Sequence, residues 1–249
     1  MKQRSLSVLL LLALVTCQRK QATSDTTSPD SLVSKASIIE SATETSAQSP
    51  DNFLIIPGLQ VGSIHADATE AGLIDILGNK NVVRDTIYVA EGTYEIGTTI
   101  FKNTADQAQI LWADNRRFAR PQSVLIRPAR DQDGHLRPGT AGPVTQWITG
   151  QKIRPGMSLR DVEKQNGNPF SLYGFDWDYG GWSTSWKGGA LEQQDGKTLI
   201  SLGFGVSESM TGAQEKLYES LMGDQEFLSS NPAMQQLNPT VQNLTISFQ

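Results

Sequence analysis

The residues that most often carry enzyme chemistry are sparse in this sequence. The 249-residue chain holds two histidines, His65 and His135, and one cysteine, Cys17. They are widely separated and lack the His and Cys spacing of a zinc site, so we expect no bound metal and no cofactor. A Ser-His-Asp site that uses either histidine stays open, because triads are assembled in space, although the chain has no G-x-S-x-G motif. We therefore expect no catalytic residues and no enzymatic activity.

Closely spaced aspartates could carry a second kind of chemistry. Asp176 and Asp178 are two residues apart, which on one strand separates their Cβ atoms by about 7 Å. Such a pair can support acid–base chemistry or bind a cation. The alternative, which we favour, is the solvent-facing side of an amphipathic strand. The stretch 131–134 opens like a calcium-binding loop, but Thr140 stands where an acidic ligand should follow, so it indicates a solvated turn.

An aromatic-rich stretch surrounds the two aspartates. Alternation over 170–179 predicts a strand, and Gly180-Gly181 suits the positive φ angles of a tight hairpin turn, with 182–186 as the returning strand. In the expected register Tyr179 faces Trp182, Trp177 faces Thr184 and Phe175 faces Trp186, which places the rings on a single face.

This face has two interpretations, a sugar- or protein-binding platform or a core beneath a helix, and we favour the core. The candidate binding surface consists of these six residues: Asp176, Trp177, Asp178, Tyr179, Trp182 and Trp186.

Two predicted helices of similar length should position the aromatic-rich stretch and the corresponding stretch in the first half of the chain. Ser158 with Asp161 is typical of a helix N-cap, and Gly167 of a helix stop. Thr69 and Gly78 repeat the same spacing. Alternating segments follow each helix, at 82–89, 94–101, 109–112 and 123–127, and again at 170–179, 182–186, 190–193 and 198–204. The sequence therefore predicts an α+β fold of two tandem units, each a helix plus a four-stranded antiparallel sheet, with a C-terminal helix and strand.

Composition divides the chain into five parts. We expect a signal segment at 1–17, a Ser- and Thr-rich disordered tether at 18–51, a first α+β repeat at 52–127, a Pro- and Gly-rich connector at 128–145, and a second repeat with its C-terminal extension at 146–249. The net charge of −5 and the pI of about 5.1 argue against nucleic acid as a partner.

The N-terminus has the pattern of an export signal. Lys2 and Arg4 precede the apolar run 8–15, and no later apolar run is long enough to span a bilayer. The run ends in Leu14-Val15-Thr16-Cys17, which resembles the lipobox of bacterial lipoproteins; the alternative is an ordinary signal peptide with a coincidental cysteine. The resemblance implies that Cys17 is acylated, for example with palmitate, and that the lipid anchors the protein to the membrane. Because no aspartate follows the cysteine, the resemblance also implies that the protein is located at the outer membrane and faces the periplasm.

A weaker resemblance concerns the second repeat. Gly156-Met157-Ser158, Val162 and Gly167-Asn168-Pro169 resemble the signature of BamE/SmpA-like lipoproteins and of β-lactamase inhibitory proteins. It implies helical segments before an antiparallel sheet, and an envelope role in protein binding or assembly with an unidentified partner. A glycan- or small-ligand-binding lipoprotein that uses the strand aromatics is the alternative.

Overall fold

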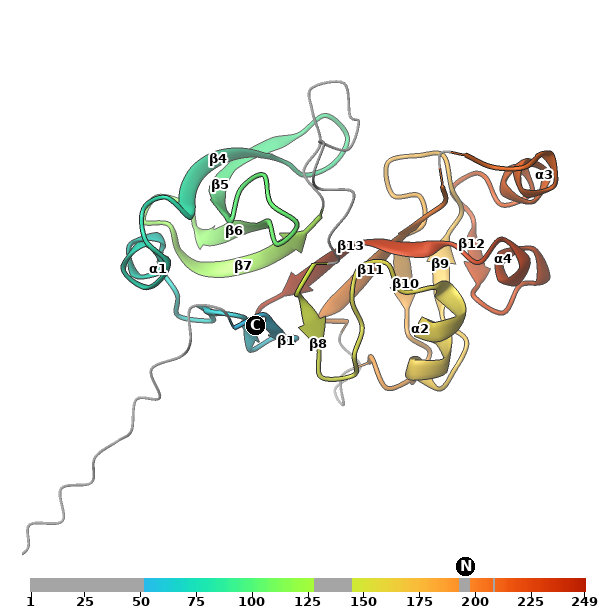
Figure 1. Cartoon of the computed structure of the whole chain (residues 1–249), viewed down its shortest axis with the longest axis horizontal. Helices are drawn as coiled ribbons and strands as arrows, with labels where there is room; N and C mark the ends of the chain where they lie inside the picture. The colour runs from blue at the N-terminus through green and yellow to red at the C-terminus, as the bar shows by residue number, and fades with distance from the viewer. Residues whose placement is uncertain (1–51, 128–144, 193–197, 208) are drawn as a thin grey trace, which may run out of the picture. The chain divides into compact units, whose positions relative to one another are not determined.

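The computed structural model describes residues 52–127, 145–192, 198–207 and 209–249. Several expectations lie outside these residues: the signal segment with Cys17, the tether, nearly all of the connector with 131–134 and His135, and the turn at Asp195-Gly196. In the described part the fold is α+β with mostly antiparallel sheets, as the sequence predicts (Figure 1).

The helices begin and end where their capping residues indicate. Helix α1 (Glu70–Leu77) is capped by the Thr69 hydroxyl, and α2 (Leu159–Asn166) by Ser158. Gly167 ends α2 in the left-handed conformation that glycine tolerates best. The remaining described helices are α3 (Gly212–Glu219) and α4 (Pro232–Leu237).

The strands form three sheets. The first has the order β3-β2-β1-β8, the second β10-β9-β12, and the third β11-β13-β7-β6-β5-β4. Their bounds are β1 (Leu54–Ile56), β2 (Gln60–Val61), β3 (Ile64–His65), β4 (Val82–Tyr88), β5 (Tyr94–Ile100), β6 (Ala108–Asp114), β7 (Ala119–Ile126), β8 (Ile148–Thr149), β9 (Ser171–Tyr173), β10 (Ser183–Ser185), β11 (Ile200–Gly205), β12 (Glu226–Leu228) and β13 (Thr240–Ser247).

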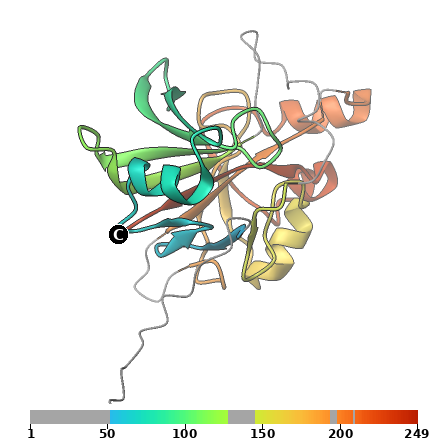
Figure 2. The same cartoon turned by 60° about the vertical axis from the view of Figure 1, so that its left-hand side comes forward.

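The first half matches its predicted order of elements. Helix α1 is followed by the antiparallel meander β4-β5-β6-β7, and Figure 2 shows α1 lying against these strands. The backbone before the helix bridges the last strand: the Glu70 N–H donates to the Phe118 carbonyl at 2.8 Å, and the Arg120 N–H to the Ala68 carbonyl at 2.9 Å. This bridge fixes the start of α1 on β7.

The second half differs from the predicted continuous meander. Strands β9 and β10 pair with each other, but β9 also pairs with β12, and β11 pairs with β13. Residues 190–192, predicted to begin a strand, form a turn. A single bridge between Trp182 and Gly203 links the β10 side to β11. The prediction missed β12 because its partner β9 lies more than fifty residues earlier in the chain.

Backbone hydrogen bonds join the start of α2 to β13, in the same way as they join the start of α1 to β7. The Leu159 N–H donates to the Pro239 carbonyl and the Val241 N–H to the Met157 carbonyl, both at 2.8 Å. Strands β7 and β13 in turn pair with each other, from Ser123 opposite Ser247 to Ile126 opposite Leu244. The two halves therefore share one six-stranded sheet.

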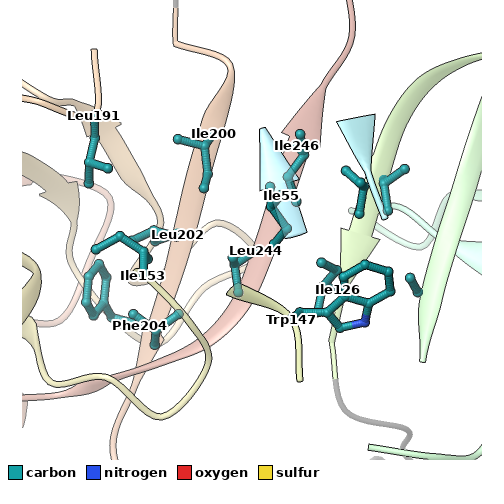
Figure 3. Close-up of a cluster of buried hydrophobic side chains, with 14 of the residues drawn as sticks. Ile55, Ile126, Trp147, Ile153, Leu191, Ile200, Leu202, Phe204, Leu244 and Ile246 are labelled. Atoms are coloured by element: carbon teal, nitrogen blue, oxygen red, sulfur yellow. The ribbon is translucent and has the colours of Figure 1, made fainter. Parts of the chain in front are cut away.

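The buried core crosses this junction. Leu202 and Phe204 of β11, Leu244 and Ile246 of β13, and Ile126 of β7 pack in one cluster (Figure 3). Because side chains of both halves fill the same core, removing either half would expose apolar surface of the other. No described helix is both long enough and apolar enough to cross a membrane.

Candidate functional site

The stretch 174–182 is a hairpin loop, and the predicted long strand is wrong here. The chain leaves β9 at Gly174, and the hairpin closes through the Tyr173 N–H, which donates to the Trp182 carbonyl at 2.9 Å. Asp176 has a φ of +68°, which breaks the alternation. Leu172 therefore pairs with Ser183, and the expected register of Tyr179 with Trp182 does not occur.

Backbone hydrogen bonds anchor this loop on two sides. The Phe204 N–H donates to the Gly181 carbonyl at 2.9 Å. The Phe175 N–H donates to the Leu221 carbonyl at 2.8 Å, and the Gly223 N–H to the Phe175 carbonyl at 2.9 Å. The side chains of the loop are thus held on a fixed backbone, which lowers the entropy cost of using them for binding.

Four consecutive side chains in the middle of the loop are exposed to solvent. Asp176, Trp177, Asp178 and Tyr179 are all exposed, with Trp177 at 36%. The Trp177 ring packs edge-on against Tyr173 at 5.1 Å and Tyr179 at 5.3 Å between centroids. Its Nε1–H donates to the Gly174 carbonyl at 3.0 Å. The ring is fixed in orientation while part of its surface faces solvent.

The tip of the β4–β5 hairpin carries a second exposed aromatic pair, which the sequence analysis missed. Tyr88 lies opposite Tyr94 in the ladder, with centroids 5.4 Å apart. Tyr94 is 62% exposed, and Ile96, two residues along β5, is 53% exposed. The alternating Tyr94 and Ile96 could have indicated an apolar face, but nothing in the sequence shows that it stays uncovered.

Tyr179 lies close to Glu91 of this hairpin tip, which brings the two groups together. The Glu91 carboxylate raises the pKa of the Tyr179 phenol above its ordinary value, and Asp178 adds to the effect. We call the combined set the aromatic surface, consisting of Tyr88, Tyr94, Ile96, Tyr173, Trp177 and Tyr179.

Trp186, one of the six candidate surface residues, lies in the core, as the favoured interpretation of the aromatic face predicts, whereas Trp177 of the same predicted face is exposed. Trp186 is fully buried at 0% exposure, packs on Phe170 with centroids 5.0 Å apart, and donates its Nε1–H to the Ile200 carbonyl at 2.9 Å. Trp182 is half-buried and bridges Gly203. Of the six predicted residues, the loop thus presents four together and places the other two outside the aromatic surface.

The carboxylates of the loop are open to solvent. Asp176 and Asp178 are exposed, whereas an acid–base pair normally needs a site sheltered from water. Within the described ranges no group of three or more His, Cys, Asp and Glu side chains could hold a metal ion. We therefore assign the two aspartates to the rim of the aromatic surface.

Two hollows of the described structure lie at other places. One is lined by residues of β11, the start of α3 and the start of β13, including Met210, Leu237 and Gln242. The other lies at the C-terminal end of α2, beside Lys164 and Pro169. Neither of these two hollows is lined by residues of the aromatic surface.

Comparisons of the chain with protein-family models, with curated proteins and with solved structures found no match.

Proposed function

We propose that the protein is a membrane-anchored lipoprotein of the bacterial cell envelope, and that it acts as a protein-interaction or assembly module without catalytic activity. The observation that carries the interaction role is the exposed aromatic surface, in which Tyr94, Ile96 and Trp177 remain open to solvent on a fixed backbone. Contiguous exposed apolar side chains with a polar rim are typical of protein-binding sites. Tyr and Trp are also the residues that most often anchor such interfaces.

The address rests on the N-terminal sequence. Lys2 and Arg4, the apolar run 8–15 and Cys17 support export and lipidation, and residues 18–51 supply a Ser- and Thr-rich tether. We propose an outer-membrane, periplasm-facing location. Several acyl chains would hold the protein stably, because each buried methylene contributes about 0.8 kcal/mol.

Replacing the cysteine tests this address. In Cys17→Ala cells we expect unprocessed precursor, or protein released from the membrane fraction, because the acyl chains have no attachment point. Immunoblots of fractionated cells measure both forms. The lipoprotein assignment fails if the variant matures and still fractionates with the outer membrane.

We also propose that the two halves are tandem copies of one helix-plus-sheet unit, related to BamE/SmpA-like proteins and β-lactamase inhibitory proteins. The equal cap-to-stop spacing supports this. So does the matching bridge before each helix, to Ala119 of β7 and Thr240 of β13. Residues 123–126 of β7 begin four residues after Ala119, and residues 244–247 of β13 begin four residues after Thr240. These two equivalent segments are also the ones that pair with each other in the sheet. In this scheme β9, β10, β11 and β13 correspond to the first meander, and 206–239 is an insertion.

Site-specific crosslinking in cells tests the interaction role. With the photoreactive amino acid p-benzoyl-phenylalanine in place of Tyr94, we expect a discrete protein adduct of the full-length lipoprotein. The same substitution at Leu59, which is similarly exposed at 57% but lies between β1 and β2, serves as the control. Equal adducts at both positions, or none at Tyr94, would contradict a protein-binding surface.

The glycan-binding alternative predicts a different result. Trp177 has a partly open ring beside the acceptor oxygens of Asp176 and Asp178, an arrangement that also suits sugars. Tryptophan fluorescence titrated with purified envelope glycans then responds, and the response disappears in Trp177→Ala. No protein adduct forms at Tyr94 in that case.

A further inference from the structure

The charge around the aromatic surface is one-sided. The three segments 88–96, 173–182 and 217–228 contain no lysine or arginine, although the whole chain has 21 of them against 26 acidic residues. They contain seven carboxylates, which are Glu91, Glu95, Asp176, Asp178, Glu219, Asp224 and Glu226. Within the three segments themselves every Lys, Arg, Asp or Glu is therefore acidic, although Lys216 stands directly before the third and Arg127 bonds to the Tyr88 carbonyl.

The three segments meet in the fold. Tyr179 lies close enough to Glu91 of the hairpin tip for the carboxylate to raise its pKa, and the Gly174 N–H donates to the Gln225 carbonyl at 2.9 Å. The Phe175 ring stacks on Tyr218 with centroids 5.3 Å apart. Burial raises the pKa of the Tyr218 phenol, and the nearby Asp176 carboxylate raises it further. Asp176 and Asp178 lie within the loop, and Glu226 lies opposite Tyr173 in the β9–β12 ladder, so these carboxylates flank the aromatic side chains.

These carboxylates are not neutralised within the described structure. The ion pairs found among the described residues join Arg84 to Glu70 at 2.5 Å and Lys102 to Asp85 at 2.8 Å, and neither involves a carboxylate of the three segments. Arg127, a described cation beside the β4–β5 hairpin, already donates to the Gln109 side-chain oxygen and to the Tyr88 carbonyl, both at 2.6 Å. Among the described residues no cation forms an ion pair with these carboxylates, and Trp177, Tyr179 and Tyr94 are partly exposed.

We propose that the aromatic surface binds a segment of its protein partner that is rich in lysine and arginine. Trp177, Tyr179 and Tyr94 offer ring faces for the cations, and the surrounding carboxylates offer ion pairs. Cation–π contacts are strongest with Trp and Tyr, and complementary charge across an interface selects the partner and speeds encounter. An anionic lipid surface would be repelled, and a neutral glycan would leave the carboxylates without a counter-charge. The proposal rests on the protein-interaction function above.

Mapping the adduct at position 94 tests this proposal. The full-length lipoprotein carrying p-benzoyl-phenylalanine at Tyr94 is irradiated in cells, and the crosslinked partner peptide is sequenced by mass spectrometry. We expect a segment in which lysine and arginine clearly outnumber acidic residues.

A pair of charge variants adds a second readout. In the background of Asp176→Asn with Asp178→Asn, we expect the adduct yield to fall about fivefold, because two exposed ion pairs together contribute about 1 kcal/mol. Asp67→Asn with Asp75→Asn removes the same charge from exposed positions at and before α1 and should leave the yield unchanged. Thermal melting checks that both double variants fold equally well.

The outcomes separate this proposal from the function on which it depends. A neutral or acidic crosslinked segment, or equal yields in the two double variants, overturns the basic-partner proposal and leaves a protein-binding surface. An absence of any protein adduct at Tyr94 above the Leu59 control overturns both.

Discussion

Trp186→Ala is expected to lower the free energy of unfolding by about 3–5 kcal/mol. The indole is fully buried against Phe170, so its removal leaves a cavity that the packed core cannot close. The Ile200 carbonyl also loses the hydrogen bond that it accepts from the Trp186 Nε1–H at 2.9 Å. Chemical denaturation of the purified protein measures this loss, which is a large share of the roughly 5–15 kcal/mol that stabilises a typical domain.

Two other tryptophan substitutions serve as controls. Trp186→Phe keeps most of the ring volume and loses the hydrogen bond, so we expect a smaller loss of about 1–3 kcal/mol. Trp177→Ala removes a ring that is 36% exposed and should cost about 1 kcal/mol or less. Similar losses for Trp177→Ala and Trp186→Ala would contradict the assignment of one ring to the surface and the other to the core.

Gly181→Ala is expected to cost about 2–5 kcal/mol. Gly181 has a φ of +75°, and an added Cβ would lie 2.2 Å from the Phe204 carbonyl oxygen. The left-handed backbone costs a non-glycine residue about 1–2 kcal/mol, and the close approach adds about 1–3 kcal/mol of overpacking. The substitution should also detach the loop from β11, because a shift of residue 181 would break the hydrogen bond from the Phe204 N–H to the Gly181 carbonyl. Denaturation measures the stability, and amide exchange of Phe204 measures the detachment.

Gly188→Ala isolates the cost of the backbone conformation. Gly188 has a similar φ of +72°, but nothing lies within 4 Å of the added Cβ. We therefore expect a loss of about 1–2 kcal/mol from the left-handed backbone alone. If both alanine variants lose the same stability, the tight contact between the loop and β11 is not a feature of the native protein.

Local signals in the sequence predicted the parts of the fold that local physics decides. Thr69 and Ser158 cap helices because a side-chain oxygen accepts a free N–H three residues later, a requirement that any helix start imposes. The first meander was also predictable, since its strands are joined in order by short turns. Its predicted strand ends agree with the observed ones to within a few residues.

Contacts between distant segments decided what the sequence could not show. Strand β9 ends at Tyr173 because Gly174 packs against the backbone of residues 221–223, where an added Cβ would lie 2.5 Å from the Leu221 carbonyl oxygen. The alternation that continues to Tyr179 therefore belongs to a loop. Likewise, nothing local indicates that β12 pairs with β9 or that β13 pairs with β7.

The candidate site was half predictable for the same reason. The run from Asp176 to Tyr179 is conspicuous in the sequence and is exposed in the structure. The other half, Tyr88 and Tyr94, lies about eighty residues earlier and joins it through Glu91 and Tyr179. The local sequence around each segment does not show that two such distant segments meet. For the same reason it could not distinguish Trp186 in the core from Trp177 on the surface.

The most direct test of a binding role for the aromatic surface is the yield of the Tyr94 crosslink in cells that carry Trp177→Ala. Removal of this ring should reduce the yield about tenfold or more, because central aromatic anchors contribute at least about 2 kcal/mol to an interface. The melting temperature should change by only a few degrees, as expected for a loss of about 1 kcal/mol. An undiminished crosslink in a stable variant would contradict the account, because Trp177 would then be an exposed ring without a binding role.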